Sequence, residues 1–149
     1  MTAAILSQSS VWLHAFNKWA ARKLSPLLLL TSRLLIAKIF WYSGLSKCEA
    51  WESTIMLFEE EYQTPFLSPE FAAYTATAFE LLCPVLLVLG LMTRLAALPL
   101  LMITLVIQFT YMDLEIHYFW AILLGFLMAM GPGKFSVDYL LERHLKRMK

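Results

Sequence analysis

The sequence predicts an all-α integral membrane protein, a four-helix bundle with an interfacial amphipathic helix at each end. Hydrophobic residues make up 60% of the 149 positions and charged residues only 15%, whereas soluble domains are roughly 45 to 50% apolar. The mean hydropathy is +0.64, and four apolar stretches are separated by polar or helix-breaking residues. No repeat divides the chain, so residues 1–149 form a single predicted domain. The net charge of +1 gives no basic field, which argues against a nucleic-acid partner.

Residues 1–25 are predicted to form an N-terminal arm that lies in the membrane interface. Trp12, Phe16 and Trp19 recur at helical spacing beside basic residues, a pattern typical of an interfacial helix. The stretch lacks the unbroken apolar core and the cleavage site of a signal peptide.

The first predicted span, Pro26 to Ser46, contains two buried-charge candidates, Arg33 and Lys38. Each would cost roughly 2.5 to 3.5 kcal/mol at a helix centre, while the Leu, Ile and Phe residues return only about 5 kcal/mol. This helix is therefore expected to need the bundle, with both cations pointing into it or reaching toward water.

Residues 47–70 form a predicted acidic outer loop, with a short amphipathic helix around Trp51 to Tyr62. Six glutamates stand there against Lys47 alone. The glutamates are interpreted as a solvated face, with a site for a cation or a basic partner as the alternative.

The second span, Phe71 to Leu91, organises the prediction because it carries Glu80 one turn before Pro84. Proline has no N–H to donate to the carbonyl of residue 80. The carbonyl and the carboxylate of Glu80 therefore both lack a hydrogen-bond partner within the helix, at the same depth of an apolar span. Such groups need partners from neighbouring helices or a water-filled cavity, and we expect the other spans to pack around this point.

The remaining chain supplies two more spans and a tail. The third span is predicted from Leu95 to Tyr111 and the fourth and shortest from Ile116 to Met130, ending at a Gly-Pro-Gly breaker. Residues 134–149 are predicted to form an amphipathic tail in which Ser136 caps a helix.

The loop charges predict the orientation. The N-terminal arm, the turn at residues 93–94 and the C-terminal tail are basic, while the 47–70 loop and the 112–117 link are acidic. Both termini are therefore expected on the cytoplasmic side of a bacterial inner membrane, with the acidic segments outside.

Counting depth along the helices predicts one polar constellation in the outer half of the bundle. It comprises Lys38, Lys47, Glu80, Gln108 and His117, with Trp41, Tyr111 and Trp120 as aromatic walls. Arg33 is expected to pair with Glu80, because the small residues Ala37 and Gly44 share its helix face. Two interpretations stay open: a structural ion pair, or a polar pocket for a quinone, another small redox molecule or a proton path.

Other chemistries find less support in the sequence. No two histidines have the spacing of a haem or zinc site on one helix, and no metal site is predicted. Cys48 and Cys83 lie about 18 Å apart in depth, so no disulfide is expected. No nucleophile motif, phosphate loop or CxxC is present, so any catalysis would use a cofactor or a partner.

Several motifs together resemble the DoxX family of small four-helix membrane proteins. They comprise Arg33 with Trp41 and the Gly44-Leu45-Ser46-Lys47 run, Glu80 with residues 87–94, His117 with Trp120, and the segment from Gly131 to Asp138. The resemblance implies association with redox or thiol and metal-stress systems, with quinone as the implied cofactor. Carried over by position, it implies Arg33, Lys47, Glu80, Arg94 and His117 as site residues, whereas Lys38 matches nothing in the pattern.

The leading functional hypothesis is a membrane subunit of a quinone-linked oxidoreductase, acting with a protein partner and in contact with membrane lipid. Glu80 would carry charge or a proton, Arg33 would be its counter-ion, and Lys47 and His117 would stand at the mouth. Gln108, Trp41 and Trp120 would line the ligand site. The alternatives are a noncatalytic membrane scaffold or assembly partner, and a small carrier of protons or metabolites.

Overall fold

The computed structural model describes residues 2–62 and 67–148, apart from the side chains of residues 2–11 and 13–15. All of the regular structure among them is helical, which confirms the all-α prediction. The elements in chain order are α1 (Thr2–Glu49), α2 (Trp51–Leu57), the π-helical turn η1 (Phe58–Tyr62), α3 (Pro69–Leu89), α4 (Thr93–Thr110), α5 (Glu115–Met130) and α6 (Val137–Arg147).

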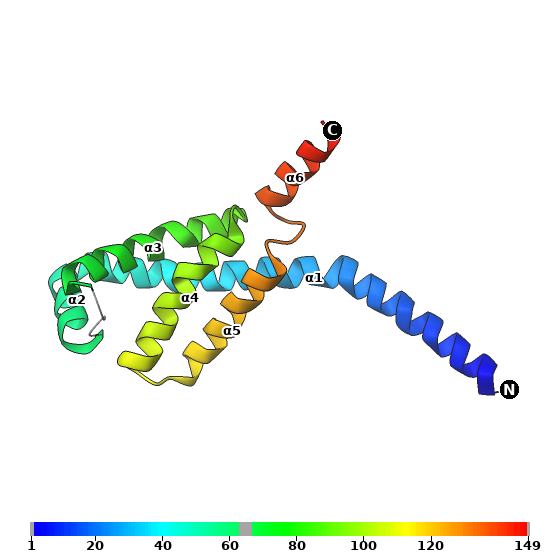
Figure 1. Ribbon diagram of the computed structural model, residues 1–149, viewed down its shortest axis with the longest axis horizontal. Coiled ribbons are helices and arrows are strands. Elements are labelled where there is room, and N and C mark those ends of the chain that lie inside the picture. The colour runs from blue at the N-terminus through cyan, green and yellow to red at the C-terminus, as the bar shows by residue number, and fades with distance from the viewer. Residues whose placement is uncertain (1, 63–66, 149) are drawn as a thin grey trace.

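The N-terminal arm and the first span form one continuous helix, α1, so the helix boundary expected at Pro26 is wrong. Proline removes one backbone hydrogen bond and bends a helix, but the helix can continue past it. In Figure 1 the blue N-terminal part of α1 leaves the line of the remaining helix and projects from the bundle. Trp12, Phe16 and Trp19 are exposed on this projecting part.

Within the described part of the chain, three helical segments are long and apolar enough to cross a membrane: Phe16–Glu49, Pro69–Leu89 and Thr93–Thr110. Helix α5 is apolar but has only 16 residues, which is about 24 Å at the helical rise. The fourth predicted span is therefore a shorter helix than its three neighbours. The chain is a multi-pass membrane protein whose apolar outer face suits contact with lipid.

The bundle is held together by a core that all four main helices share. Helix α3 runs back along α1, and α4 and α5 form a hairpin that packs across them (Figure 1). Fully buried apolar side chains fill the centre: Ile36, Leu87, Leu100, Leu124 and Leu127. Alanines at 73 and 97 are fully buried as well, and such small residues let helices approach closely.

The ends of the helices follow the sequence signals. Ser68 caps α3 and Ser136 caps α6, each accepting from a backbone N–H three residues on. Gly90 ends α3 in the left-handed conformation, with φ of 67°. The helix predicted around residues 51–62 is present as α2 and η1, whose buried Phe58 and Tyr62 pack against α3.

Candidate functional site

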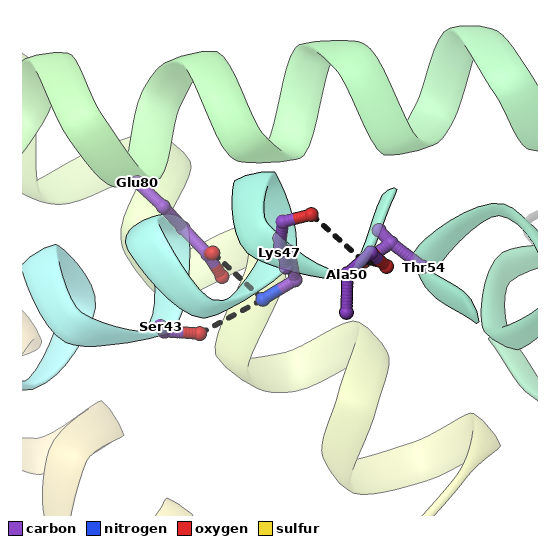
Figure 2. Close-up of polar contacts among 5 residues, drawn as sticks. All are labelled: Ser43, Lys47, Ala50, Thr54 and Glu80. Carbon is purple, nitrogen blue, oxygen red and sulfur yellow. Dashed lines mark hydrogen bonds and ion pairs between the residues drawn. The ribbon is translucent and has the colours of Figure 1, made fainter. Parts of the chain in front are cut away.

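Glu80 forms a buried ion pair with Lys47. The Lys47 Nζ lies 2.7 Å from Glu80 Oε2, and the Glu80 side chain is 1% exposed. Lys47 also donates to the Ser43 hydroxyl one helical turn earlier, at 2.8 Å. Figure 2 shows the ammonium of Lys47 between the two oxygens, with Glu80 reaching across from α3.

Local features of α1 bring these two side chains together. A Cβ on Gly44 would lie 3.2 Å from the Glu80 Cβ and 2.9 Å from a Leu81 methyl, so glycine allows α3 to pack closely against α1. Beyond Lys47, the Thr54 hydroxyl lies 3.2 Å from the Lys47 carbonyl and 3.0 Å from that of Ala50 (Figure 2). This contact fastens α2 to the end of α1 and fixes the backbone that carries Lys47.

The expected pair between Arg33 and Glu80 is wrong. Arg33 is fully buried, as expected for a charge within this helix, but its Nη2 donates to the backbone carbonyl of Phe135. Lys38 is exposed and is not the partner of Glu80 either. Lys47 takes that role because it lies on the α1 face that Gly44 brings against α3, whereas Arg33 lies nearer the C-terminal end of α3.

Arg33 belongs to a second polar centre, which we call the arginine junction: Arg33, Gly90, Thr93, Phe135 and Asp138. A Cβ on Gly90 would lie 1.8 Å from the Arg33 Nη1, so only glycine leaves room for the guanidinium. The Asp138 carboxylate accepts from the N–H groups of Met92 and Thr93, at 3.0 and 3.4 Å. The junction thus joins α1, the α3–α4 turn and the start of α6.

Arg94 stands beside this junction but contacts a different element. Its Nη2 donates to the Ala129 carbonyl in the last turn of α5, at 3.3 Å. A cation at a helix C-terminus is favourable to the helix dipole. Arg94 is therefore placed to hold α4 against α5.

Gln108 and His117 form a hydrogen-bonded network with Asp113. The Gln108 Oε1 lies 2.9 Å from the His117 Nδ1 and accepts from the Leu114 N–H at 3.2 Å. The Gln108 Nε2 donates to Asp113 Oδ1. Gln108 and His117 are both buried, so this network fixes the link between α4 and α5 and orients the histidine ring.

The Glu80 and His117 side chains line one cavity of about 360 Å³. Its lining residues are Ile39, Phe40, Tyr42, Ser43, Glu80, Thr104, Ile107, His117 and Trp120. The Glu80 Oε1 is buried and has no hydrogen-bond partner among the described residues. We call this cavity with Lys47, Gln108 and Asp113 the Glu80 site.

The aromatic residues proposed as walls divide between two places. Trp120 lines the Glu80 cavity, and its ring packs against both Phe40 and His117. Trp41 instead lines a shallow hollow on the other side of α1, together with Lys38. The structure therefore brings together Lys47, Glu80, Gln108, His117 and Trp120, and leaves Arg33, Lys38 and Trp41 outside.

A larger and almost wholly apolar groove lies between α3 and α4 beneath η1. Its volume is about 510 Å³, and Lys47 lines it along with apolar residues that include Phe58, Tyr62, Phe79, Met102 and Ile107. Lys47 faces this groove while its partner Glu80 faces the cavity, so the ion pair stands between the two spaces.

Outside the membrane segments, the pKa of Tyr62 departs from its ordinary value. Burial, followed by the charge of Glu80 and by Tyr111, raises the pKa of the Tyr62 phenol to about 12. The two tyrosine rings also stack edge to face, with centroids 5.3 Å apart. Tyr62 is therefore a neutral side chain in the lining of the apolar groove, which Lys47 also lines.

Two other features complete the description of reactive groups. Among the described residues no group of three or more His, Cys, Asp and Glu side chains could hold a metal ion. Cys48 is exposed, Cys83 is buried, and both are free thiols.

Sequence reasoning missed Ser43, Thr104 and Asp113 as members of the site. Ser43 had a usable signal, since it lies four residues before Lys47 and so on the same helix face. Asp113 had a weaker one, as an acidic residue in the short link next to His117. Thr104 gave no signal, because a threonine within an apolar span commonly bonds to its own helix, as Thr104 does to the Leu100 carbonyl.

Comparison with known families gives one match. The sequence model of the DoxX family matches residues 28–113, which is more than half of the chain and includes Arg33, Lys47, Glu80 and Gln108. No curated protein and no solved structure matches the chain.

Proposed function

This chain belongs to the DoxX family, and from that premise we propose that it is the membrane subunit of a quinone-linked redox system. In this proposal the Glu80 site binds the ring of a quinone. A protein partner supplies the electrons to the quinone or removes them from it.

The observation that carries the proposal is the free oxygen of Glu80. A buried carboxylate oxygen is costly unless something satisfies it, and Glu80 Oε1 has no partner among the described residues although it belongs to a cavity-lining side chain. The cavity of about 360 Å³ lies within the roughly 300 to 1,000 Å³ range of small-molecule sites. Its aromatic lining from Phe40 and Trp120 suits a planar ring.

Each residue of the site has a separate role in this proposal. Glu80 accepts or releases a proton at Oε1, and Lys47 neutralises its charge through Oε2, at 2.7 Å. His117 is the second proton-exchanging group on the cavity, and Gln108 holds its ring. A bound quinone would supply two-electron, two-proton redox chemistry, which these side chains cannot perform alone.

The adjoining groove supports the same ligand class. A membrane quinone carries a long apolar tail, and the groove between α3 and α4 offers about 510 Å³ with an almost wholly apolar lining. Lys47 lines this groove and pairs with Glu80 of the cavity. We therefore place the tail in the groove and the ring in the cavity.

We further propose that the protein lies in a bacterial inner membrane with both termini in the cytoplasm. The basic arm, the basic 93–94 turn and the basic tail support this orientation, as do the acidic α2 and η1 segments at the opposite end of the bundle. In this orientation Lys47 and the Glu80 site lie toward the outer side, and the arginine junction lies toward the cytoplasm.

The test is to extract the protein gently with its lipids and to measure bound quinone by optical absorption and mass spectrometry. The wild type is compared with Glu80→Gln and with Glu70→Gln, which makes the same chemical change at an exposed position of the same helix. We expect quinone in the wild type and in Glu70→Gln, and a loss of about tenfold or more in Glu80→Gln.

Preparations that fold correctly and carry no quinone in any variant would contradict the proposal. Equal quinone content in Glu80→Gln and the wild type would also contradict the role given to Glu80.

A further inference from the structure

The orientation of the Gln108 side chain is fixed by its two partners outside the cavity. A backbone N–H can only donate, so the group facing the Leu114 N–H, at 3.2 Å, is the amide oxygen. An ionised carboxylate can only accept, so the group facing Asp113 is the amide nitrogen. Reversing the amide would break both hydrogen bonds at once.

The fixed amide determines which nitrogen of His117 carries the proton. The His117 Nδ1 lies 2.9 Å from the same Gln108 oxygen, which can only accept, so Nδ1 must be the donor. In a neutral imidazole a proton on Nδ1 leaves Nε2 as an acceptor. No hydrogen bond to Nε2 is found within residues 2–62 and 67–148, and the ring lines the cavity.

The other buried polar groups of the cavity also present acceptors. Glu80, paired with the Lys47 ammonium through Oε2, is an acceptor at Oε1. The Thr104 hydroxyl gives its proton to the Leu100 carbonyl at 2.8 Å, which leaves only its oxygen lone pairs. The Ser43 hydroxyl, which also lines the cavity, accepts from the Lys47 ammonium at 2.8 Å and gives its own proton to the Glu80 carboxylate. The potential donors Tyr42 and Trp120 lie nearer the surface, and Tyr42 is 63% exposed.

A cavity whose fixed polar groups are acceptors matches a ligand that brings donors. A quinone has two carbonyl oxygens, which accept, whereas the corresponding hydroquinone has two hydroxyl groups, which donate. Placing an acceptor against an acceptor leaves both unsatisfied in a buried site, which is the costly arrangement for polar groups.

We propose that the Glu80 site selects the reduced, dihydroxy form of its ligand, with Glu80 Oε1 and His117 Nε2 as the two acceptors. This inference rests on the proposed function and adds to it the redox form that is held most tightly. Gln108 is a positioning residue, because it acts on the ligand only through the proton that it fixes on His117.

The test measures binding of a short-chain benzoquinone, its hydroquinone and the dimethyl ether of that hydroquinone to the full chain in lipid nanodiscs, without oxygen. The hydroquinone is expected to bind about tenfold or more tightly than either of the others, because neither of them can donate. In Gln108→Met, which keeps the side-chain length and removes the amide, this preference is expected to shrink severalfold.

A second readout does not depend on any ligand. Nitrogen NMR of the His117 ring is expected to show a protonated Nδ1 and an unprotonated Nε2 in the wild type, and a mixture of tautomers in Gln108→Met. A proton on Nε2 of the neutral wild-type ring would overturn the inference.

The binding results separate this inference from the proposed function. If the quinone binds as tightly as the hydroquinone, or more tightly, the redox preference is wrong while quinone binding stands. If none of the three compounds binds to a folded protein, both proposals are wrong.

Discussion

Helix α1 buries two cations against its neighbours, Lys47 at the Glu80 site and Arg33 at the arginine junction, and the two have different partners. Lys47 donates to two side chains, the carboxylate of Glu80 and the hydroxyl of Ser43. Arg33 instead contacts the backbone: it donates to the Phe135 carbonyl, and its guanidinium packs against Gly90, which has no side chain to displace it. Both centres keep buried polar atoms without a hydrogen-bond partner among the described residues, Oε1 on Glu80 and Nε and Nη1 on Arg33. The difference is that Glu80 lines a cavity of about 360 Å³, whereas the guanidinium of Arg33 lies against the backbone of Gly90 and Phe135.

Burial and charge do not by themselves mark a functional residue in this bundle. Arg33 is as deeply buried as Glu80, and both belong to the motifs of one family. A cation bound to a backbone carbonyl between two helices fixes the fold, while an acid with an unpartnered oxygen beside a cavity can bind a ligand.

The largest expected effect is on stability and comes from the arginine junction. Gly90→Ala would place a Cβ 1.8 Å from the Arg33 guanidinium at a residue with φ of 67°. We expect a loss of about 3 kcal/mol or more of unfolding free energy, from strain and from displacement of a buried charge. Denaturation in detergent measures it.

Gly125→Ala is the matched control, since a Cβ there would meet nothing within 4 Å. It is expected to stabilise the protein by about 0.5 to 1 kcal/mol, because alanine favours a helix more than glycine does. Equal effects of the two substitutions would mean that the junction does not hold Arg33 as described.

A smaller effect is expected from the coupling between Lys47 and Glu80. In a double-mutant cycle with Lys47→Met and Glu80→Gln, the coupling free energy should be about 1 to 3 kcal/mol, as for contacting charges in one network. The same cycle with Lys38→Met should give less than about 0.5 kcal/mol, because Lys38 is exposed. A stronger coupling to Lys38 would show that the pairing assigned to Lys47 is wrong.

The smallest expected effect is a pH dependence from Tyr62, which lines the apolar groove between α3 and α4. The folded protein favours the neutral phenol, whose pKa is raised from 10.0 to about 12. The stabilisation is therefore complete below pH 10, and it is lost as the pH rises toward 12, by on the order of 1 kcal/mol. Tyr62→Phe should flatten this part of the stability profile, and an unchanged slope would show that another group titrates there.

Much of the fold and part of the site could be predicted from the sequence. Hydropathy and helix-breaking residues located the apolar helices, and depth counting placed Glu80, Lys47, Gln108 and His117 in the outer half of the bundle. The helix boundary expected at Pro26 was wrong, because one proline bends a long helix without ending it.

The pairing of the charges could not be predicted in the same way. The partner of Arg33 is a backbone carbonyl 102 residues away, and a carbonyl has no residue type by which a sequence reveals it. The partner of Glu80 depends on the rotation and close approach of α1 and α3, which the single glycine at 44 permits. The proton on His117 depends on the Leu114 N–H and on Asp113, neither of which stands out in the sequence.

The most direct test of the division between the two centres measures ligand content and stability in the same two variants, Glu80→Gln and Arg33→Lys. We expect that Glu80→Gln stays folded and loses its quinone, whereas Arg33→Lys loses stability while its folded fraction keeps the quinone. The reverse result, with quinone retained in Glu80→Gln and lost from folded Arg33→Lys, would contradict it.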